Sequence, residues 1–454
     1  MVKIMLKKGF SEKVMEYGKS KGFTDMEIYY SAGSNLSIKV FEQKIDNYSL
    51  SQSEGVSFRG LYNGKMGYSY TEKIDDSSVE FLVDEAMENA EIIDTDDEEK
   101  IFGGSSEYTK IDNYNPALED VKEEDKIKFT LRMEEEAKKL DSRIESIQYC
   151  VYGDGSDEMS LANSMGLSLE DRSNAAFAYI GVVAKEKDDI KTGFGYKVTN
   201  DFTELDPCKI ANEAVEEAIS MLGAETVESG NYKVILRNNA AADLIDAFSG
   251  IFSAERVQKD LSLMKGKLNT KIAVEKLTLV DNPHLKEGFA SSSFDGEGHA
   301  TYRKNIIEKG VLKTYMHNLK TSEKDGVEST GNASRGSYKS SIGIAPSNLY
   351  VEKGDKGLED MIKGTDIGIL IIDLQGLHSG LNSLSGDFSL SCYGYMIEGG
   401  KKTRPVNQIT VSGNFFNMIN NIEEIGSDLR FGLPSDAYIG SPSIKIKSLS
   451  IAGK

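Results

Sequence analysis

Residues 54–70 read EGVSFRGLYNGKMGYSY, and this stretch predicts a β-hairpin. Two runs rich in aromatic and apolar residues, Val56–Phe58 and Met66–Tyr70, flank the dipeptide Asn63-Gly64. Asn and Gly tolerate positive φ better than other residues, so an Asn-Gly pair between two such runs is a strong signal of a tight hairpin turn. We therefore expect the chain to build its fold on antiparallel strands.

Further strands and helices are expected on both sides of this hairpin. Upstream, residues 36–40 alternate apolar and polar side chains, which predicts a half-buried strand, and residues 11–21 predict a helix. Downstream, Ser77-x-x-Glu80 predicts a capping box at the start of an amphipathic helix, and a second, charged helix is expected over 123–140. These elements give an N-terminal α/β domain over residues 1–112.

The central part of the sequence predicts an antiparallel sheet with a packed helix. A strand is expected over 147–152, followed by turns at Gly153-Asp154-Gly155 and at Asn163–Gly166. Asp206-Pro207 places an N-cap residue before proline at the first helical position. This gives a central antiparallel sheet-plus-helix domain over residues 113–228.

Strands dominate the last part of the sequence, which we take as a third domain over residues 229–454. A single early helix is expected over 239–250, and the remaining run of strands is typical of a sandwich or barrel. The expected fold class is therefore α+β: a mixed α/β N-terminal half with antiparallel strands and packed helices, followed by a strand-rich, barrel- or sandwich-like C-terminal domain. The expected strands are 232–237, 277–280, a hairpin over 306–312, 367–373, and 388–397 returning through 398–401.

The composition excludes several classes of protein. The chain carries 53 Lys and Arg against 73 Asp and Glu, and this net charge of −20 opposes the phosphate neutralisation that nucleic-acid binding needs. No apolar run is long enough to span a bilayer, and charge returns at Lys7 before a secretory signal could form. We expect a cytoplasmic protein with neither nucleic-acid nor membrane partners. Its cysteines, which are Cys150, Cys208 and Cys392, allow no disulfide framework and no CxxC zinc pattern.

Acidic residues and histidines offer no recognisable metal motif. Nine acidic residues face one basic residue over 84–100, and we interpret this run as a solvated helix face and loop. No two histidines lie one helical turn apart, so the usual paired-histidine motif is missing. We expect His284, His299 and His317 to be ordinary polar surface residues.

One cluster concentrates groups that could bind substrate. The candidate substrate-binding residues are His378, Ser379, Asn382 and Asp387, which lie among glycines and serines. A catalytic interpretation pairs Ser379 with His378, but Gly-x-x-Ser-Gly is not the Gly-x-Ser-x-Gly nucleophile elbow, and the same residue types suit a turn. The glycine-rich stretches match neither the Walker motif nor the dinucleotide fingerprint, so no nucleotide site is predicted.

Taken together, the ordered motifs of the chain resemble the TldD/PmbA family and, within it, the PmbA (TldE) branch. Each motif alone is a glycine-rich turn, but the ordered set covers nearly the whole chain. The resemblance rests on Glu54–Arg59, Gly67–Tyr70, Ala162–Gly166, Phe294–Gly298, Ser329–Asn332, Ser385–Ser389, Pro405–Asn414 and Gly440–Pro442.

The resemblance implies a peptidase built from two related chains, of which the TldD-type chain binds zinc through His-Glu-x-x-x-His and a distant cysteine. In this sequence the first motif corresponds to residues 246–251, and the cysteine falls near Asp428. The lost metal-site positions are thus Asp246, Ala247, Ile251 and Asp428. A chain without these ligands and without the general base cannot activate a zinc-bound water. The two aspartates could in principle bind a harder metal, but we expect them to cap or pair with backbone and basic groups.

The function implied by the resemblance is that of a PmbA/TldE-like, non-metal subunit of a cytoplasmic two-chain metallopeptidase. Such enzymes degrade unfolded polypeptides or process small peptides, including modified peptide antibiotics in some members. We expect no cofactor on this chain, zinc on a TldD-like partner, and a homodimer where that partner is missing; whether the chain is itself an enzyme stays open. The alternatives are a non-enzymatic peptide- or protein-binding protein and an independent hydrolase that uses Ser379, His378 or Asp387.

Overall fold

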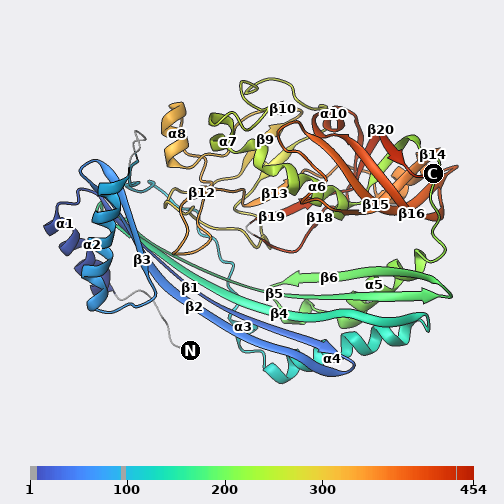
Figure 1. Cartoon of the computed structure of the whole chain (residues 1–454), viewed down its shortest axis with the longest axis horizontal. Coiled ribbons are helices and arrows are strands. Elements are labelled where there is room, and N and C mark those ends of the chain that lie inside the picture. The colour runs from blue at the N-terminus through green and yellow to red at the C-terminus, as the bar shows by residue number, and fades with distance from the viewer. Residues whose placement is uncertain (1–7, 94–98, 436) are drawn as a thin grey trace.

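The structure is a computed structural model that describes residues 8–93, 99–435 and 437–454. Two halves lie one above the other in Figure 1: a long, curved sheet with helices at its left end and along its lower side, and a half that contains a barrel and a second sheet. The expected α+β fold with a strand-rich, barrel-containing second part is confirmed. The N-terminal residues 1–7 and residues 94–98 of the acidic run lie outside the described residues.

The lower half is a six-stranded antiparallel sheet in the order β3-β2-β1-β4-β5-β6. Its strands are β1 (Met26–Phe41), β2 (Lys44–Tyr62), β3 (Lys65–Thr71), β4 (Ile144–Asn163), β5 (Ser168–Glu186) and β6 (Asp189–Thr199). Its helices are α1 (Lys8–Lys21), α2 (Ser77–Ile92), α3 (Pro116–Glu119), α4 (Glu123–Leu140) and α5 (Pro207–Ser220), with a 3₁₀ turn, η1, at Phe202–Glu204. Because β1 pairs with β4 from Glu27 to Lys39, the sheet is continuous across residue 112. The divisions at residues 112 and 228 stay predictions.

Two apolar cores hold the helices against this sheet. At one end, α1 and α2 bury Val14 and Leu82 against Phe58 of β2. At the other end, α4 and α5 cover the sheet, and Met133 packs in the same core as Ile180 of β5. Alternate side chains of a strand point to opposite faces, so the other face of the sheet is turned towards the upper half.

Most local predictions for the lower half are confirmed. β2 and β3 form the predicted hairpin, in which Tyr62 pairs with Lys65 around Asn63-Gly64. The charged helix is α4, and Asp206 caps α5 by accepting a hydrogen bond from the Cys208 backbone N–H at 3.0 Å. The turn at Asn163–Gly166 joins β4 to β5.

Two local predictions are wrong. The predicted turn at Gly153–Gly155 lies within the continuous strand β4, where the glycines provide space rather than a bend. A Cβ on Gly153 would collide with the ring of Phe177 on the neighbouring strand. The Ser77 capping box does not form, because Ser77 is already helical and its backbone N–H donates to Asp75 at 2.9 Å.

The upper half contains a closed five-stranded barrel in the order β16-β15-β14-β7-β20, closed by pairing of β16 with β20. Its strands are β7 (Gly230–Leu236), β14 (Ile367–Gln375), β15 (Asp387–Glu398), β16 (Lys401–Asn414) and β20 (Ile444–Ala452), and β17 (Ile422–Ile425) pairs with β20. β7 runs parallel to β14, whereas the other pairs are antiparallel.

A second sheet, in the order β10-β9-β8-β13-β19-β18, packs beside the barrel. Its strands are β8 (Leu279–Asp281), β9 (Lys304–Glu308), β10 (Val311–Leu312), β13 (Asn348–Val351), β18 (Arg430–Phe431) and β19 (Tyr438–Ser441), and β11 (Ala333–Ser334) pairs separately with β12 (Gly343–Ile344). The helices are α6 (Asn238–Ser249), α7 (Ala254–Gln258), α8 (Leu319–Asp325), α9 (Leu358–Lys363) and α10 (Phe415–Asn420), with a 3₁₀ turn, η2, at Gly250–Phe252. In the described part of the chain, no helix is both long and apolar enough to cross a membrane.

Candidate functional site

Helix α6 and turn η2 carry the positions where the resemblance would place metal ligands. Asp246 lies on the exposed side of α6, Ala247 follows it, and Ile251 of η2 is fully buried in the apolar core. The structure does bring Asp428 to the start of this helix, since the Asn238 side chain donates to the Asp428 backbone oxygen at 3.0 Å. Ala and Ile have no donor atom for a metal, so these residues do not fit the zinc site of a TldD-type chain.

The Asp428 carboxylate is occupied by the backbone and side chain of Ser443. It accepts from the Ser443 backbone N–H at 3.0 Å and from the Ser443 hydroxyl at 2.7 Å, which ties the segment after β17 to the start of β20. Asp246 has no hydrogen-bond or ion-pair partner among the described residues. No three His, Cys, Asp or Glu side chains in the described ranges lie close enough together to hold a metal ion.

The loop between β14 and β15 carries His378, Ser379 and Asn382, and Asp387 is the first residue of β15; all four candidate substrate-binding residues are exposed. Asn382 supports the loop, because its Oδ1 accepts from the Leu384 backbone N–H at 2.9 Å. Asp387 accepts from the Asn414 side chain at 2.9 Å, which joins the ends of β15 and β16. Within the described residues, His378 and Ser379 form no hydrogen bond with each other, so this loop holds no nucleophile–base pair. A role of His378, Ser379, Asn382 and Asp387 in substrate binding stays a prediction.

One expectation for the histidines is wrong. His317 is only 3% exposed, and burial lowers its pKa, so it is a core residue rather than a polar surface residue. His284 and His299 are half-buried in loops. A ring nitrogen of His284 lies 3.1 Å from the Thr301 hydroxyl, and one of His299 lies 3.0 Å from the Ala300 backbone oxygen.

A cleft that the sequence did not predict runs between the sheet and the upper half, and we call it the inter-half cleft. Its largest hollow, about 930 Å³, lies between Phe177 of β5 and the loop at Phe289. A second hollow of about 340 Å³ shares Asp157 with the first, and a third of about 250 Å³ shares Tyr29 and Arg335 with the second. The shared walls make these hollows one groove along the upper faces of β1, β4 and β5.

The outer part of the inter-half cleft combines aromatic rings with amides and one free carboxylate. Phe177 and Tyr179 stack with 6.1 Å between their ring centroids. Burial raises the pKa of Asp157, whose carboxylate has no hydrogen-bond or ion-pair partner in the described ranges. Aromatic faces accept apolar side chains, and unpaired polar groups accept or donate hydrogen bonds. This lining therefore suits an extended peptide, because a peptide offers apolar side chains as well as hydrogen-bond donors and acceptors.

At the inner end of the cleft, a buried ionic network joins the two halves. Glu27 of β1 is 0% exposed, accepts from Arg59 Nε at 2.8 Å and Nη2 at 3.0 Å, and pairs with Arg335 of the upper half. Arg59 Nη1 also lies 3.8 Å from Glu297 Oε1. Burial alone would raise the pKa of Glu27, but the charges of Arg335 and Arg59 lower it below its usual value. The Arg335 guanidinium lies 4.6 Å from the ring centre of Tyr29.

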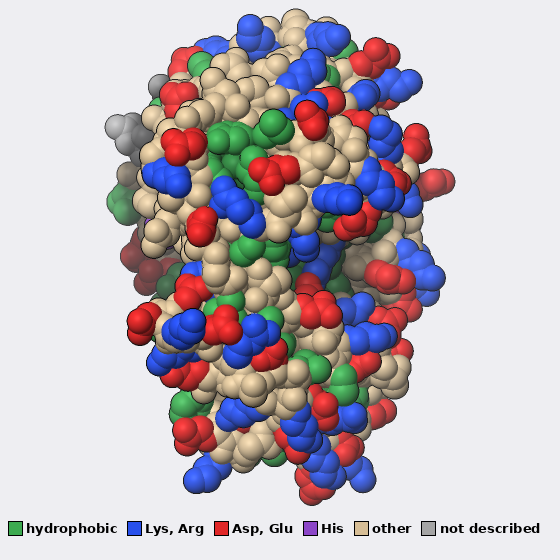
Figure 2. Space-filling view, turned by 90° about the vertical axis from the view of Figure 1, so that its right-hand side faces the viewer, with side chains coloured by type: hydrophobic (Ala, Val, Ile, Leu, Met, Phe, Trp, Pro, Cys, Tyr) green, Lys and Arg blue, Asp and Glu red, His purple; other side chains and the backbone are tan. Residues whose placement is uncertain are grey.

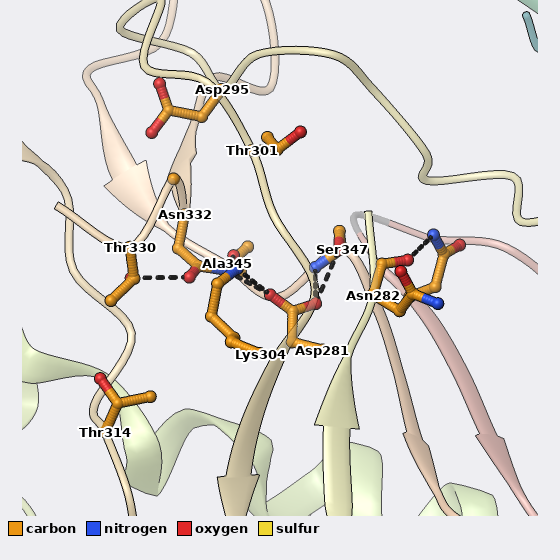
Figure 3. Close-up of polar contacts among 12 residues, drawn as sticks. Asp281, Asn282, Asp295, Thr301, Lys304, Thr314, Thr330, Asn332, Ala345 and Ser347 are labelled. Carbon is orange, nitrogen blue, oxygen red and sulfur yellow. Dashed lines mark hydrogen bonds and ion pairs between the residues drawn. The ribbon is translucent and has the colours of Figure 1, made fainter. Parts of the chain in front are cut away.

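The inner wall of the cleft is held by Asp281, which Figure 3 shows at the end of β8 among residues of three other segments. Asp281 is fully buried, and Lys304 Nζ lies 3.0 Å from its Oδ2. The Asn332 side chain donates to the same oxygen at 2.8 Å, while Ser347 donates to Oδ1 through its backbone N–H at 2.8 Å and its hydroxyl at 2.6 Å. Asn332 and Ser347 both line the third hollow. Asp281 thus fixes the shape of the closed end of the cleft.

A separate hollow of about 660 Å³ lies between α5 and the barrel, on the side of the molecule shown in Figure 2. Arg237 Nη1 pairs with Glu217 Oε2 there at 2.7 Å.

Burial, with the charges of Glu217 and Asp243, raises the pKa of Asp373 to about 7. Burial, with the charge of Asp246, raises the pKa of Asp243 to about 6. Acidic side chains therefore lie close together beside α6, where burial and mutual repulsion favour the protonated forms of Asp243 and Asp373.

Domain profiles of one known family match three consecutive parts of the chain. Domain 1 of the PmbA/TldA metallopeptidases matches residues 26–90, the central domain matches 116–222 and the C-terminal domain matches 229–453. The chain belongs to the PmbA/TldD family. The resemblance that the motifs indicated is thereby confirmed, and the relatives below place the chain with the PmbA/TldE-like members.

Curated proteins named as metalloproteases are similar over most of the chain. The metalloprotease PmbA homolog of Buchnera aphidicola subsp. Acyrthosiphon pisum is 30% identical over 307 residues, which cover 67% of this chain and 66% of that protein. A metalloprotease of Methanocaldococcus jannaschii is 27% identical over 93% of each chain. The metalloprotease PmbA of Escherichia coli O157:H7 is 23% identical over 96% of this chain and 93% of its own.

Two solved structures share the fold of this chain. A proposed modulator of a DNA gyrase from Thermotoga maritima is 32% identical with a TM-score of 0.91, and the match covers 98% of this chain and 99% of that one. TldE from Thermococcus kodakarensis matches with a TM-score of 0.90 over 98% of this chain and 100% of its own. At 22% identity this second match is evidence for the fold alone.

Sequence reasoning missed the residues that line the inter-half cleft. Asp157 and Phe177 lie in strands, and Arg335 lies in a loop, without any local motif. A signal was present for the ionic network, because Arg59 and Glu297 lie inside two of the quoted PmbA/TldD motifs. A charged residue inside a glycine-rich motif, where turn chemistry does not require it, indicates a buried pair with another such motif.

Proposed function

We propose that this chain is the PmbA/TldE-like subunit of a two-chain peptidase, in which a TldD-like partner holds the zinc and carries out the chemistry. The observation that carries this proposal is the lack of metal-binding side chains in α6 and η2: the side chains of Ala247 and Ile251 have no metal donor, and the Asp428 carboxylate is already hydrogen-bonded by Ser443. A related protein supports the existence of such partners, since the metalloprotease TldD homolog of Buchnera aphidicola subsp. Acyrthosiphon pisum is 30% identical over 54% of this chain.

The role of the chain in this proposal is to hold the substrate, an unfolded polypeptide or small peptide, in the inter-half cleft. The two larger hollows of the cleft have volumes of about 930 and 340 Å³, and its aromatic rings and the free Asp157 carboxylate support binding of apolar side chains and main-chain N–H groups. A cytoplasmic location is part of this proposal. A homodimer is the expected state where the partner is missing.

The test is a peptidase assay on an unfolded protein and on short peptides, with this chain alone, with a TldD-like partner, and with both plus a zinc chelator. We expect activity only in the mixture, saturating at equal amounts of the two chains and lost with the chelator. Zinc measured by mass spectrometry should be substoichiometric in this chain alone. Activity or stoichiometric zinc in this chain alone would contradict the proposal.

Cleft variants separate substrate binding from assembly. Phe177→Ala and Asp157→Ala should raise KM of the mixed enzyme severalfold without changing the amount of partner bound. Phe81→Ala is the matched control, because Phe81 is exposed on α2 away from the cleft lining. Unchanged KM in both cleft variants would remove the cleft from the proposal.

A second candidate is a protein that holds peptides without any proteolysis, and the same cleft together with the missing ligands favours it. In that case the mixture stays inactive, while fluorescence anisotropy still detects binding of a labelled peptide that Phe177→Ala weakens.

A further inference from the structure

The Arg335 side chain is buried at the inner end of the inter-half cleft and leaves one of its hydrogen-bond donors unused. The side chain is 2% exposed, and Arg335 lines both the second and the third hollow. Its Nη2 pairs with Glu27, and the guanidinium lies against the ring of Tyr29. Among the described residues, nothing accepts a hydrogen bond from Arg335 Nε. A buried donor without an acceptor destabilises the folded protein, so this position suits a ligand that supplies an acceptor.

A second unused donor lies next to Arg335 in the chain. The residues that line both hollows are Tyr29, Met159, Ser334 and Arg335. The Tyr29 hydroxyl already donates to the Met159 sulfur at 4.0 Å. The Ser334 hydroxyl, by contrast, has no hydrogen-bond partner in the described ranges. Ser334 and Arg335 therefore offer a hydroxyl and a guanidinium to one and the same ligand.

The inner end also carries positive charge that is only partly balanced. Glu27 is one carboxylate between two guanidiniums, since it pairs with both Arg59 and Arg335. Glu297 lies 3.8 Å from Arg59, but burial raises the pKa of Glu297 to about 7, so this carboxyl group is protonated part of the time at neutral pH. Asp295, which lines the third hollow, accepts from three backbone N–H groups that offset its charge. An anionic ligand is therefore attracted to Arg335.

Beyond Arg335 the cleft ends in a small, mainly apolar hollow. The third hollow, of about 250 Å³, has Met159, Pro283 and Phe294 in its walls. The contacts of Asp281 close it, as described above. An extended chain that enters from the outer part of the cleft thus has room for an apolar side chain beyond Arg335 and must end there.

We propose that Arg335 and Ser334 bind the C-terminal carboxylate of a peptide whose last side chain, an apolar one, fills the third hollow. The inference rests on the proposed role of the inter-half cleft as a peptide site, and it adds the direction of the peptide, which runs from Phe177 past Asp157 to Arg335 with its C-terminus inward. Arginine forms strong charge-assisted hydrogen bonds with carboxylates, and capture of a terminal carboxylate recurs in peptide recognition. The opposite direction would place a terminal ammonium group against the guanidinium, which repels it.

Fluorescence anisotropy with the whole chain alone, without zinc or a partner, tests the proposal. The probe is a short peptide with a label at its N-terminus and leucine as its last residue, made as the free acid and as the C-terminal amide. We expect the acid to bind at least about tenfold more tightly than the amide. Equal affinities for the acid and the amide would overturn the proposal.

A further probe distinguishes a terminal carboxylate from a side-chain carboxylate. It is the C-terminal amide of the same peptide with glutamate in place of the last leucine. We expect it to bind as weakly as the leucine amide, because its carboxylate lies on a side chain that belongs in the apolar hollow. If it binds as tightly as the leucine acid, the site reads side-chain carboxylates and the proposal is wrong.

Variants assign the preference to individual residues. In Arg335→Gln the ratio of the acid and amide affinities should fall to about one, and in Ser334→Ala it should fall severalfold. Arg172→Gln is the matched control, because it removes the same charge from the second hollow, while the Arg172 guanidinium is stacked 3.7 Å from the ring centre of Tyr114. This control should keep the ratio of the unaltered chain. A ratio that persists in Arg335→Gln would contradict the assignment.

The folding of each variant is verified by circular dichroism. If Arg335→Gln does not fold, the comparison of acid and amide on the unaltered chain still decides the proposal. The binding assay and the peptidase assay also fail separately. A preference for the acid together with an inactive mixture keeps this site and favours the peptide-holding protein, whereas an active mixture together with equal binding of acid and amide removes this site alone.

Discussion

At the scale of single residues, the buried ionic network of Glu27, Arg59 and Arg335 joins the two halves. Glu27 balances the charges of Arg59 and Arg335, and removing one member of such a buried network leaves the others without compensation. We expect Glu27→Ala to lower the free energy of unfolding by about 3–5 kcal/mol in urea denaturation. Asp76→Ala, which breaks the exposed Lys13–Asp76 pair, should cause no measurable change. Equal effects of the two variants would show that the network contributes no special stability.

Asp373 should make stability depend on pH. Its pKa is raised from 3.8 to about 7, first by burial and then by the charges of Glu217 and Asp243. Between these pH values the folded state holds a proton that the unfolded state has released, so stability falls as the pH rises through this window. The slope is at most about 1.4 kcal/mol per pH unit. Urea denaturation from pH 4 to pH 8 should show a shallower decline for Asp373→Asn, whose amide stays neutral; an unchanged slope would assign the decline to other groups.

At the scale of elements, glycines set how closely helices approach the sheet. Gly193 of β6 faces α5, where a Cβ would lie 2.5 Å from the Ala218 backbone nitrogen. We expect Gly193→Ala to push α5 outward and to lower the free energy of unfolding by about 1–3 kcal/mol. In Gly343→Ala, by contrast, the new Cβ meets no atom within 4 Å, and thermal denaturation should detect almost no change.

The turn of the β1–β2 hairpin depends on a single side chain of α4. Glu134→Ala removes the acceptor for the backbone N–H groups of Glu42 and Gln43, and we expect a loss of about 2–3 kcal/mol in the free energy of unfolding. Amide exchange at these two residues should accelerate by a larger factor than exchange elsewhere. Glu135→Ala, on the exposed side of the same helix, should change neither quantity; if it does, helix propensity rather than the turn contact explains the result.

The sequence predicted elements well where local chemistry decides and poorly where distant residues do. Asn63-Gly64 and Asp206-Pro207 specify a turn and a helix start by their own backbone preferences, and both were predicted correctly. Gly153 looks the same as a turn glycine in the sequence. Glycine is needed at position 153 because the ring of Phe177 on the neighbouring strand leaves no room for a Cβ. No local sequence pattern reveals this contact.

At the scale of the whole molecule, the same limit explains why the candidate site was found only in part. The lost metal positions on α6 could be read from aligned motifs, because they are close in sequence. The inter-half cleft brings together Tyr29, Asp157 and Arg335, which lie in three segments that meet only when the halves close on each other. His317 was misjudged for the same reason, since the surrounding chain that buries it is distant in sequence.

The closure of the barrel determines when the two halves can be completed during synthesis. The lower sheet has all its strands once β6 has left the ribosome, and most of them pair with a neighbour in the chain. β7 is made next, but its partners are β14 and β20, and β20 also closes the barrel against β16. Unpaired strands and exposed apolar surface in such intermediates are prone to aggregation. A nascent chain of this protein therefore carries a finished lower half and an open barrel, which needs protection for as long as the ribosome takes to travel from β7 to β20.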